Sequence, residues 1–219
     1  MKAFILCLLL SMICFSAFAQ PFTSLNEAGL LMVYQDLNEA ANQFEGNNKI
    51  RSIVIANSVK TIPEGAFKRT GVRDITFQPP SSLTVIPFEA FWGNYYVTRV
   101  FLPESVTTIE AAAFASCSGL QQIRLSHGLK AINEGAFEDT RITRLYIPDS
   151  VGYIGAGILD HTDTIQSLRL PADADVARDN LFYNAYIRNE KKAGIYTRSG
   201  TDKQQWIYSP DKPEDEYYR

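Results

Sequence analysis

A unit of about 23 residues recurs six times along this chain and constrains its fold more than any other feature. Each unit opens with Φ-x-x-Φ-x-Φ, where Φ is apolar, continues with a pair of the type Val-x-x-Ile, and closes with a small residue followed by a large apolar one. The units begin at Ile50, Val72, Val97, Leu120, Ile142 and Ile165, in steps of 22, 25, 23, 22 and 23 residues. A fixed period in this range is typical of a solenoid, in which each unit forms one coil.

The repeated pattern predicts which part of each coil forms a strand and which part fills the core. The Φ-x-Φ portions are rich in β-branched residues and leucine, so we expect parallel strands at 53–55, 75–77, 100–102, 123–125, 145–147 and 168–170. The small-large pairs, such as Ala66-Phe67 and Ala136-Phe137, place a large side chain in the core where coils crowd. The 20–29-residue period indicates a leucine-rich-repeat solenoid.

The segments that flank residues 50–182 are expected to cover the two open ends of the solenoid. Residues 24–44 fit a helix with a capping box at Ser24 and an apolar stripe, so residues 20–49 are predicted to be an N-terminal capping helix. Residues 183–209 are predicted to be a C-terminal hairpin, with strands at 193–197 and 204–208, and residues 210–219 a flexible tail. The expected fold class is therefore an α+β repeat protein.

The N-terminus has the features of a secretory signal peptide over residues 1–19. Lys2 gives a positive start, an apolar run follows, and Ala17-Phe18-Ala19 is a cleavage motif, so we expect export and no membrane span in the mature chain. Cleavage removes one lysine and no acidic residue, which changes the net charge from −3 to −4 and argues against a nucleic-acid partner. Only Cys117 then remains, so no internal disulfide can form.

Two units carry a longer match to a known repeat. Residues 97–109 read Val-Thr-Arg-Val-Phe-Leu-Pro-Glu-Ser-Val-Thr-Thr-Ile and are followed by Ala113-Phe114-Ala-Ser-Cys117, and residues 142–154 repeat the pattern. About 130 residues resemble the BspA-like leucine-rich repeats of bacterial surface proteins. The resemblance implies a secreted or surface protein and adhesion to host or neighbouring-cell proteins. Within it, Cys117 corresponds to a core position of the repeat.

The sequence contains no constellation that favours catalysis. His127 and His161 are the only histidines, and neither has metal-ligand spacing to a cysteine or another histidine. No phosphate-binding glycine loop and no nucleophile elbow is present. We therefore expect a protein that is not an enzyme and that needs no cofactor or metal.

The strands present a candidate ligand-binding face. Side chains alternate across a strand, so with the Φ positions in the core the intervening residues point outward. Stacked strands then bring together two aromatic residues and four arginines, the composition of binding hot spots. This predicted ligand-binding set is Arg99, Phe101, Arg124, Arg144, Tyr146 and Arg169. The alternative is that these residues only favour strands and keep the face soluble.

A secondary candidate site lies in the longest unit. This unit has about two extra residues near Trp92, Tyr95 and Tyr96, and insertions in repeats form loops on one face. The alternative is that Trp92 packs into the convex side. The pattern supports three functions: an exported binding protein, possibly an adhesin, that recognises a host or envelope protein or glycoprotein; an envelope scaffolding protein; or a glycan-binding protein that stacks sugars on this loop.

Overall fold

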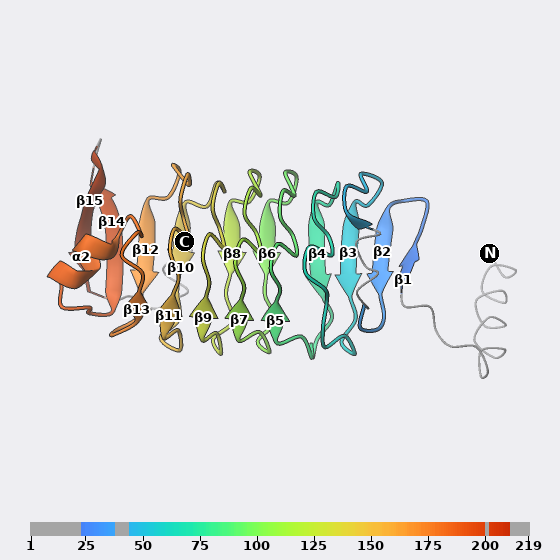
Figure 1. The fold of residues 1–219 in the computed structure, drawn as a ribbon, viewed down its shortest axis with the longest axis horizontal. Helices are drawn as coiled ribbons and strands as arrows, with labels where there is room; N and C mark the ends of the chain where they lie inside the picture. The colour runs from blue at the N-terminus through green and yellow to red at the C-terminus, as the bar shows by residue number, and fades with distance from the viewer. Residues whose placement is uncertain (1–22, 38–43, 200–201, 211–219) are drawn as a thin grey trace, which may run out of the picture.

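The computed structural model describes residues 23–37, 44–199 and 202–210. These residues form an elongated parallel β-solenoid whose coils follow one another in chain order along the long axis (Figure 1). The longer strands are β2 Leu30–Val33, β3 Ser52–Ile55, β4 Asp74–Phe77, β6 Arg99–Phe101, β8 Gln122–Arg124, β10 Arg144–Tyr146 and β12 Ser167–Leu170. The shorter ones are β5 Val85–Ile86, β7 Thr108–Ile109, β9 Ala131–Ile132, β11 Tyr153–Ile154 and β13 Asp175–Val176.

The strands form two rows, one for each extended segment of the repeat. In the first row, all pairs are parallel: β2 with β3, β3 with β4, β6 with β8 and β10 with β12. In the second row, the strands follow the order β5, β7, β9, β11, β13. The predicted solenoid of parallel strands is therefore confirmed. The α+β class is wrong, because α2 (Tyr183–Arg188) is the only α-helix among the described residues.

The core is a continuous ladder of stacked phenylalanine rings. Phe67, Phe91, Phe114 and Phe137 are fully buried, and successive ring centroids lie 5.4, 5.3 and 6.2 Å apart. Phe44 extends this ladder beyond the first repeat, at 6.0 Å from Phe67. The large residue of the small-large pair thus fills the core, as the repeat pattern predicts.

In five units, a buried polar or sulfur-containing side chain stands three residues after the large residue of the small-large pair. These residues are Thr70, Asn94, Cys117, Thr140 and Thr162. Four of them hydrogen-bond backbone carbonyls of the turns, as in the bonds from the Asn94 amide to Phe67 and Phe91 and from the Cys117 thiol to Phe91. Burial raises the pKa of Cys117 to about 12. The interpretation of Cys117 as a core position of the repeat is confirmed.

The predicted N-terminal helix is wrong over the part of it that the structure describes. β1 (Thr23–Leu25) and β2 form an antiparallel hairpin, and β2 pairs in parallel with β3. Gly29 makes the turn at φ +83°, and the Asn26 side chain accepts a hydrogen bond from Leu30 N at 2.9 Å. The hairpin forms because β3 would otherwise expose an unpaired edge, whose backbone groups β2 satisfies. Residues 38–43 of the predicted helix lie outside the described residues.

The C-terminal end is closed by α2 and an aromatic hairpin. β14 (Gly194–Ser199) pairs antiparallel with β12 and with β15 (Asp202–Ser209), so both strands that the sequence predicts are present. The Tyr186 hydroxyl on α2 donates to Pro171 O and accepts from Ala174 N, while Phe182 packs edge-on against Trp206. Short α2 was not expected. Residues 1–19 and 211–219, where a signal peptide and a tail are expected, lie outside the described residues.

Candidate binding face

The outward side chains of β6, β8, β10 and β12 form one surface, called here the sheet face. It consists of Arg99, Phe101, Gln122, Arg124, Arg144, Tyr146, Ser167 and Arg169. Arg99 lies beside Gln122 and Phe101 beside Arg124 in one strand pair, and Arg144 beside Ser167 and Tyr146 beside Arg169 in the other. The four strands lie side by side in Figure 1. The structure thus brings the predicted primary residues together on neighbouring strands.

Phe101 is the most exposed large apolar residue of this face. The residue is 53 % exposed, and it lines a groove of about 450 Å³ at the C-terminal ends of β4 and β6. The groove walls come from Phe77, Pro79, Pro80, Ser81, Leu102, Pro103, Glu104 and Ser105, and the peptide bond between the two prolines is cis. The row of longer strands is interrupted between β4 and β6, and again between β8 and β10, since these strands belong to different sheets. Sequence reasoning missed this groove; the consecutive prolines were its only local signal.

Arg169 was predicted to be an exposed ligand contact, and this prediction is wrong. Only 2 % of its surface is exposed. Its guanidinium donates to Ile147 O at 3.0 Å, pairs with Asp149 Oδ1 at 2.6 Å and lies 5.0 Å from the centroid of the Tyr146 ring. β14 pairs with β12 and places buried Ile195 directly opposite Arg169. Arg169 is therefore a buried, hydrogen-bonded group that fixes the loop after β10.

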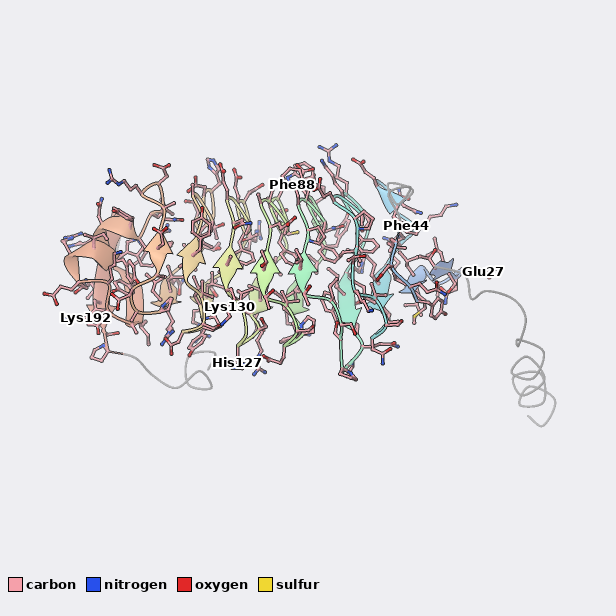
Figure 2. All side chains as sticks on the ribbon, turned by 60° about the horizontal axis from the view of Figure 1, so that its bottom comes forward. Glu27, Phe44, Phe88, His127, Lys130 and Lys192 are labelled. Atoms are coloured by element: carbon pink, nitrogen blue, oxygen red, sulfur yellow. The ribbon has the colours of Figure 1, made fainter. Side chains whose placement is uncertain are left out.

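The remaining polar groups give the sheet face a positive centre with an acidic rim. Arg99 and Arg124 are exposed, and Arg144 is half-buried. At the rim, both carboxylate oxygens of Glu104 lie 3.1 Å from Nδ1 of His127, and one also accepts a hydrogen bond from His127 N. Slight burial raises the pKa of Glu104, but the hydrogen bonds from His127 outweigh it, so this pKa is lowered overall. Figure 2 shows His127 at the edge of the molecule opposite Phe88.

The secondary candidates lie together in the insertion, but they are not equivalent. Tyr95 and Tyr96 are 50 and 57 % exposed. Trp92 is half-buried, and its ring has the Arg69 guanidinium at 4.4 Å and the Lys68 ammonium at 4.9 Å. Because two cations already lie against the Trp92 ring, the tyrosines are the better stacking platforms. The Arg73 guanidinium lies 5.7 Å from the Tyr96 ring.

Other features of the described surface indicate no defined chemistry. A second hollow, of about 570 Å³, is lined by residues 60–64 and by Thr84, Val85, Pro87 and Glu110. The carboxylate of Glu110 accepts a hydrogen bond from Phe88 N at 2.9 Å and so fixes the turn after β5. Within the described ranges, no three His, Cys, Asp or Glu side chains gather in a way that could hold a metal ion.

The family model for the BspA type leucine rich repeat region matches this chain in six copies, over residues 10–98, 38–166 and 84–191. Together these matches cover well over half of the sequence. The chain belongs to the BspA-type leucine-rich-repeat family. The family resemblance expected from residues 97–117 and 142–154 is therefore confirmed. No curated protein matches the chain.

Solved structures show a similar solenoid at low sequence identity. The pneumococcal vaccine antigen PcpA shares 18 % identity at a TM-score of 0.52, over 74 % of this chain and 50 % of that one. A leucine-rich cell surface protein from Faecalibacterium prausnitzii shares 19 % identity at a TM-score of 0.46, over 84 % of this chain and 58 % of its own. This BspA-type chain thus spans between half and three fifths of these two relatives. In the described part of the chain, no helix has the length and apolar character needed to cross a bilayer.

Proposed function

We propose that this BspA-type protein is an exported, non-enzymatic binding protein that recognises a protein or glycoprotein ligand through the sheet face. The proposal is carried by one observation, the exposed Phe101 ring in its groove, with Arg99 and Arg124 beside it. An aromatic anchor flanked by arginines is the composition of binding hot spots. Parallel strands hold these groups in place, so little conformational entropy is lost on binding. Export is supported by the signal-peptide features of residues 1–19.

The ligand should have an apolar or aromatic side chain for the groove and acidic groups for the arginines. Arginines at the edge of an interface mainly accelerate encounter, whereas a buried aromatic anchor sets the lifetime of the complex. Tyr146 is a weaker candidate for direct contact than the sequence predicts, because its ring already packs against Arg169. Arg169 itself is not part of the proposed contact set.

The test compares two variants of the immobilised protein against an extracellular-matrix extract and a cell-envelope fraction. The sheet-face variant is Phe101→Ala with Arg124→Gln, and the matched control is Tyr95→Ala with Tyr96→Ala. We expect the ligand captured by the wild type to be retained by the control and lost by the sheet-face variant. In titrations with that purified ligand, Kd should rise at least about 30-fold, which corresponds to about 2 kcal/mol.

The exposed tyrosines of the insertion favour a second candidate function, the binding of a glycan. Tyr95 and Tyr96 offer two large aromatic surfaces to solvent on adjacent residues. This function predicts the reverse outcome of the same comparison: the tyrosine variant loses binding to the glycans of the envelope fraction, and the sheet-face variant keeps it. That result would overturn the assignment of the ligand to the sheet face.

A further inference from the structure

The hollow of about 570 Å³ lies at the end of the second row of strands, where the backbone pairing between neighbouring coils stops. β5 is the last strand of this row (Figure 1), and residues 60–62 of the preceding coil occupy the repeat position of a further strand. At the next junctions a backbone hydrogen bond joins the coils, from Thr107 N to Thr84 O at 2.8 Å and from Lys130 N to Thr107 O at 2.7 Å. No backbone hydrogen bond joins residues 60–63 to residues 84–87, and both segments belong to the described part of the chain. β5 therefore presents an unpaired edge to the hollow.

Pro87 explains why the pairing stops here. In the next three coils the residue at this position donates its N–H to the preceding coil, in bonds from Glu110 N to Ile86 O, from Asn133 N to Ile109 O and from Gly155 N to Ile132 O, at 2.9, 2.9 and 2.8 Å. Proline has no N–H, so Ile62 O receives no hydrogen bond at the equivalent place. Among the described residues, Lys60 O likewise accepts no hydrogen bond and Thr84 N donates none. One wall of the hollow thus carries unpaired acceptors and the other wall an unpaired donor.

Both walls of the hollow are held in place by contacts outside it. Asp36 Oδ1 accepts hydrogen bonds from Lys60 N at 2.5 Å and from Thr61 N at 2.9 Å, which fixes the first wall. β5 is fixed from its other side by parallel pairing with β7. Directly after the hollow, Gly65 N donates to Phe88 O at 2.9 Å and joins the two coils again. The hollow is therefore preformed, so a ligand that enters it loses little free energy to ordering the protein.

We propose that this hollow binds an extended peptide segment of another protein, which adds to the edge of β5 as a further strand. An extended peptide offers N–H and C=O groups on both of its edges, so it can donate to the acceptors of the first wall and accept from Thr84 N. Such strand addition takes its affinity from main-chain hydrogen bonds and its specificity from side chains. The volume of the hollow lies within the range of about 300–1,000 Å³ that is usual for ligand sites. The hollow lies on the second row and the sheet face on the first, so this site is separate from that of the proposed function.

The lining of the hollow indicates which side chains the segment should carry. Glu64 is exposed and Glu110 is half-buried, and both line the hollow, so a lysine or arginine of the segment meets two carboxylates. Lys60 also lines the hollow, which leaves one net negative charge for the ligand to balance. Val85 and Pro87 add apolar surface, which suits the β-branched side chains that favour strands. We therefore expect the segment to carry a basic residue among β-branched ones.

The test starts from a library of random peptides of about 12 residues displayed on phage, which is selected on the immobilised protein that begins at Gln20. We expect the enriched clones to share a short run of β-branched residues that contains one lysine or arginine. The peptide of the most enriched clone is synthesised with a fluorescein label and titrated with the protein. N-methylation of the backbone amides in this run should raise Kd at least about tenfold, because each methyl group removes one donor and blocks its approach to a wall.

Two pairs of protein variants locate the bound peptide. Val85→Trp fills the hollow and should raise Kd at least about tenfold, whereas Ala131→Trp, at the same position of β9 within the intact row, should leave Kd within about twofold. Glu64→Lys should raise Kd more than about tenfold because like charges then face one another, and Glu134→Lys, at the same position of another repeat and also exposed, should not. Exchange of the basic residue of the peptide for glutamate should restore binding to the Glu64→Lys variant, a result that a misfolded variant could not give.

Four outcomes would overturn the proposal. Selection without any shared run would mean that the hollow recognises no extended peptide. Equal binding of the N-methylated peptides would exclude pairing with the edge of β5. Equal values of Kd in a hollow variant and its matched control would place the peptide elsewhere. Enriched clones that match a stretch of this chain itself would assign the hollow to a second copy.

The sheet-face variant separates this proposal from the proposed function. Phe101→Ala with Arg124→Gln should bind the selected peptide like the wild type, because neither residue lines the hollow. A loss of peptide binding in this variant would place the peptide on the sheet face instead. The ligand test under Proposed function uses other ligands and another site, so the two proposals can fail separately.

Discussion

At the scale of single residues, the inner phenylalanines of the core ladder, Phe67, Phe91 and Phe114, each stack on the ring of the coil before and of the coil after. Phe91 is fully buried between Phe67 and Phe114, at 5.4 and 5.3 Å. We expect Phe91→Ala to lower the free energy of unfolding by about 3–5 kcal/mol, because it removes apolar burial and leaves a cavity within the ladder. Denaturant unfolding measures the loss, and a value well below 1 kcal/mol would contradict the core assignment.

Arg169 shows how one neighbour changes the role of a residue. Arg169→Ala removes the hydrogen bond to Ile147 O and the ion pair with Asp149. Because a buried acceptor then has no donor, we expect a loss of about 1–3 kcal/mol in the free energy of unfolding. Arg124→Ala, at an exposed position of the same column, should change stability by no more than about 0.5 kcal/mol. Equal losses in the two variants would mean that the hydrogen bond and ion pair of Arg169 do not stabilise the fold.

At the scale of elements, β2 covers the first repeat, and the stability of the first coil depends on this packing. Leu31 and Val33 are fully buried, whereas Met32 between them points to the other side of the sheet. We expect Leu31→Ala to cost about 2–5 kcal/mol, and Met32→Ala much less. In a solenoid each coil contacts only its neighbours, so the first coil should open first. Hydrogen exchange of the β3 amides checks this, and unchanged protection there would exclude β2 as a cap.

At the scale of the whole molecule, Cys117 reports on opening of the central coils. It is fully buried, its thiol donates to Phe91 O at 3.2 Å, and burial raises its pKa to about 12. In the unfolded chain a thiol has a pKa near 8.5, so only opened molecules react quickly with a thiol reagent. In the protein that begins at Gln20, where Cys117 is the single cysteine, the labelling rate at pH 8 should follow the unfolded fraction. Fast labelling under native conditions would show that the solenoid opens locally at its centre.

The repeat pattern by itself determined the solenoid, its coil length, its strands and the phenylalanine ladder, because each unit has the same local pattern and every coil packs against an equivalent neighbour.

The two ends and the binding face depended on the tertiary structure. Gly29, three residues after Asn26, was the sign of a turn that was missed within the predicted N-terminal helix. The apolar residues of the predicted helix fit the spacing of a helix and also that of a strand. Residues 30–33 form a strand because they pair with the edge of β3. Arg169 looks like Arg124 in the sequence, yet it is buried, on a strand that pairs with β14, and forms an ion pair with Asp149. The groove at Phe101 likewise depends on two coils, because its walls come from the segments that follow β4 and β6. The tertiary structure decided these features because each depends on a contact outside the repeat that carries the residue.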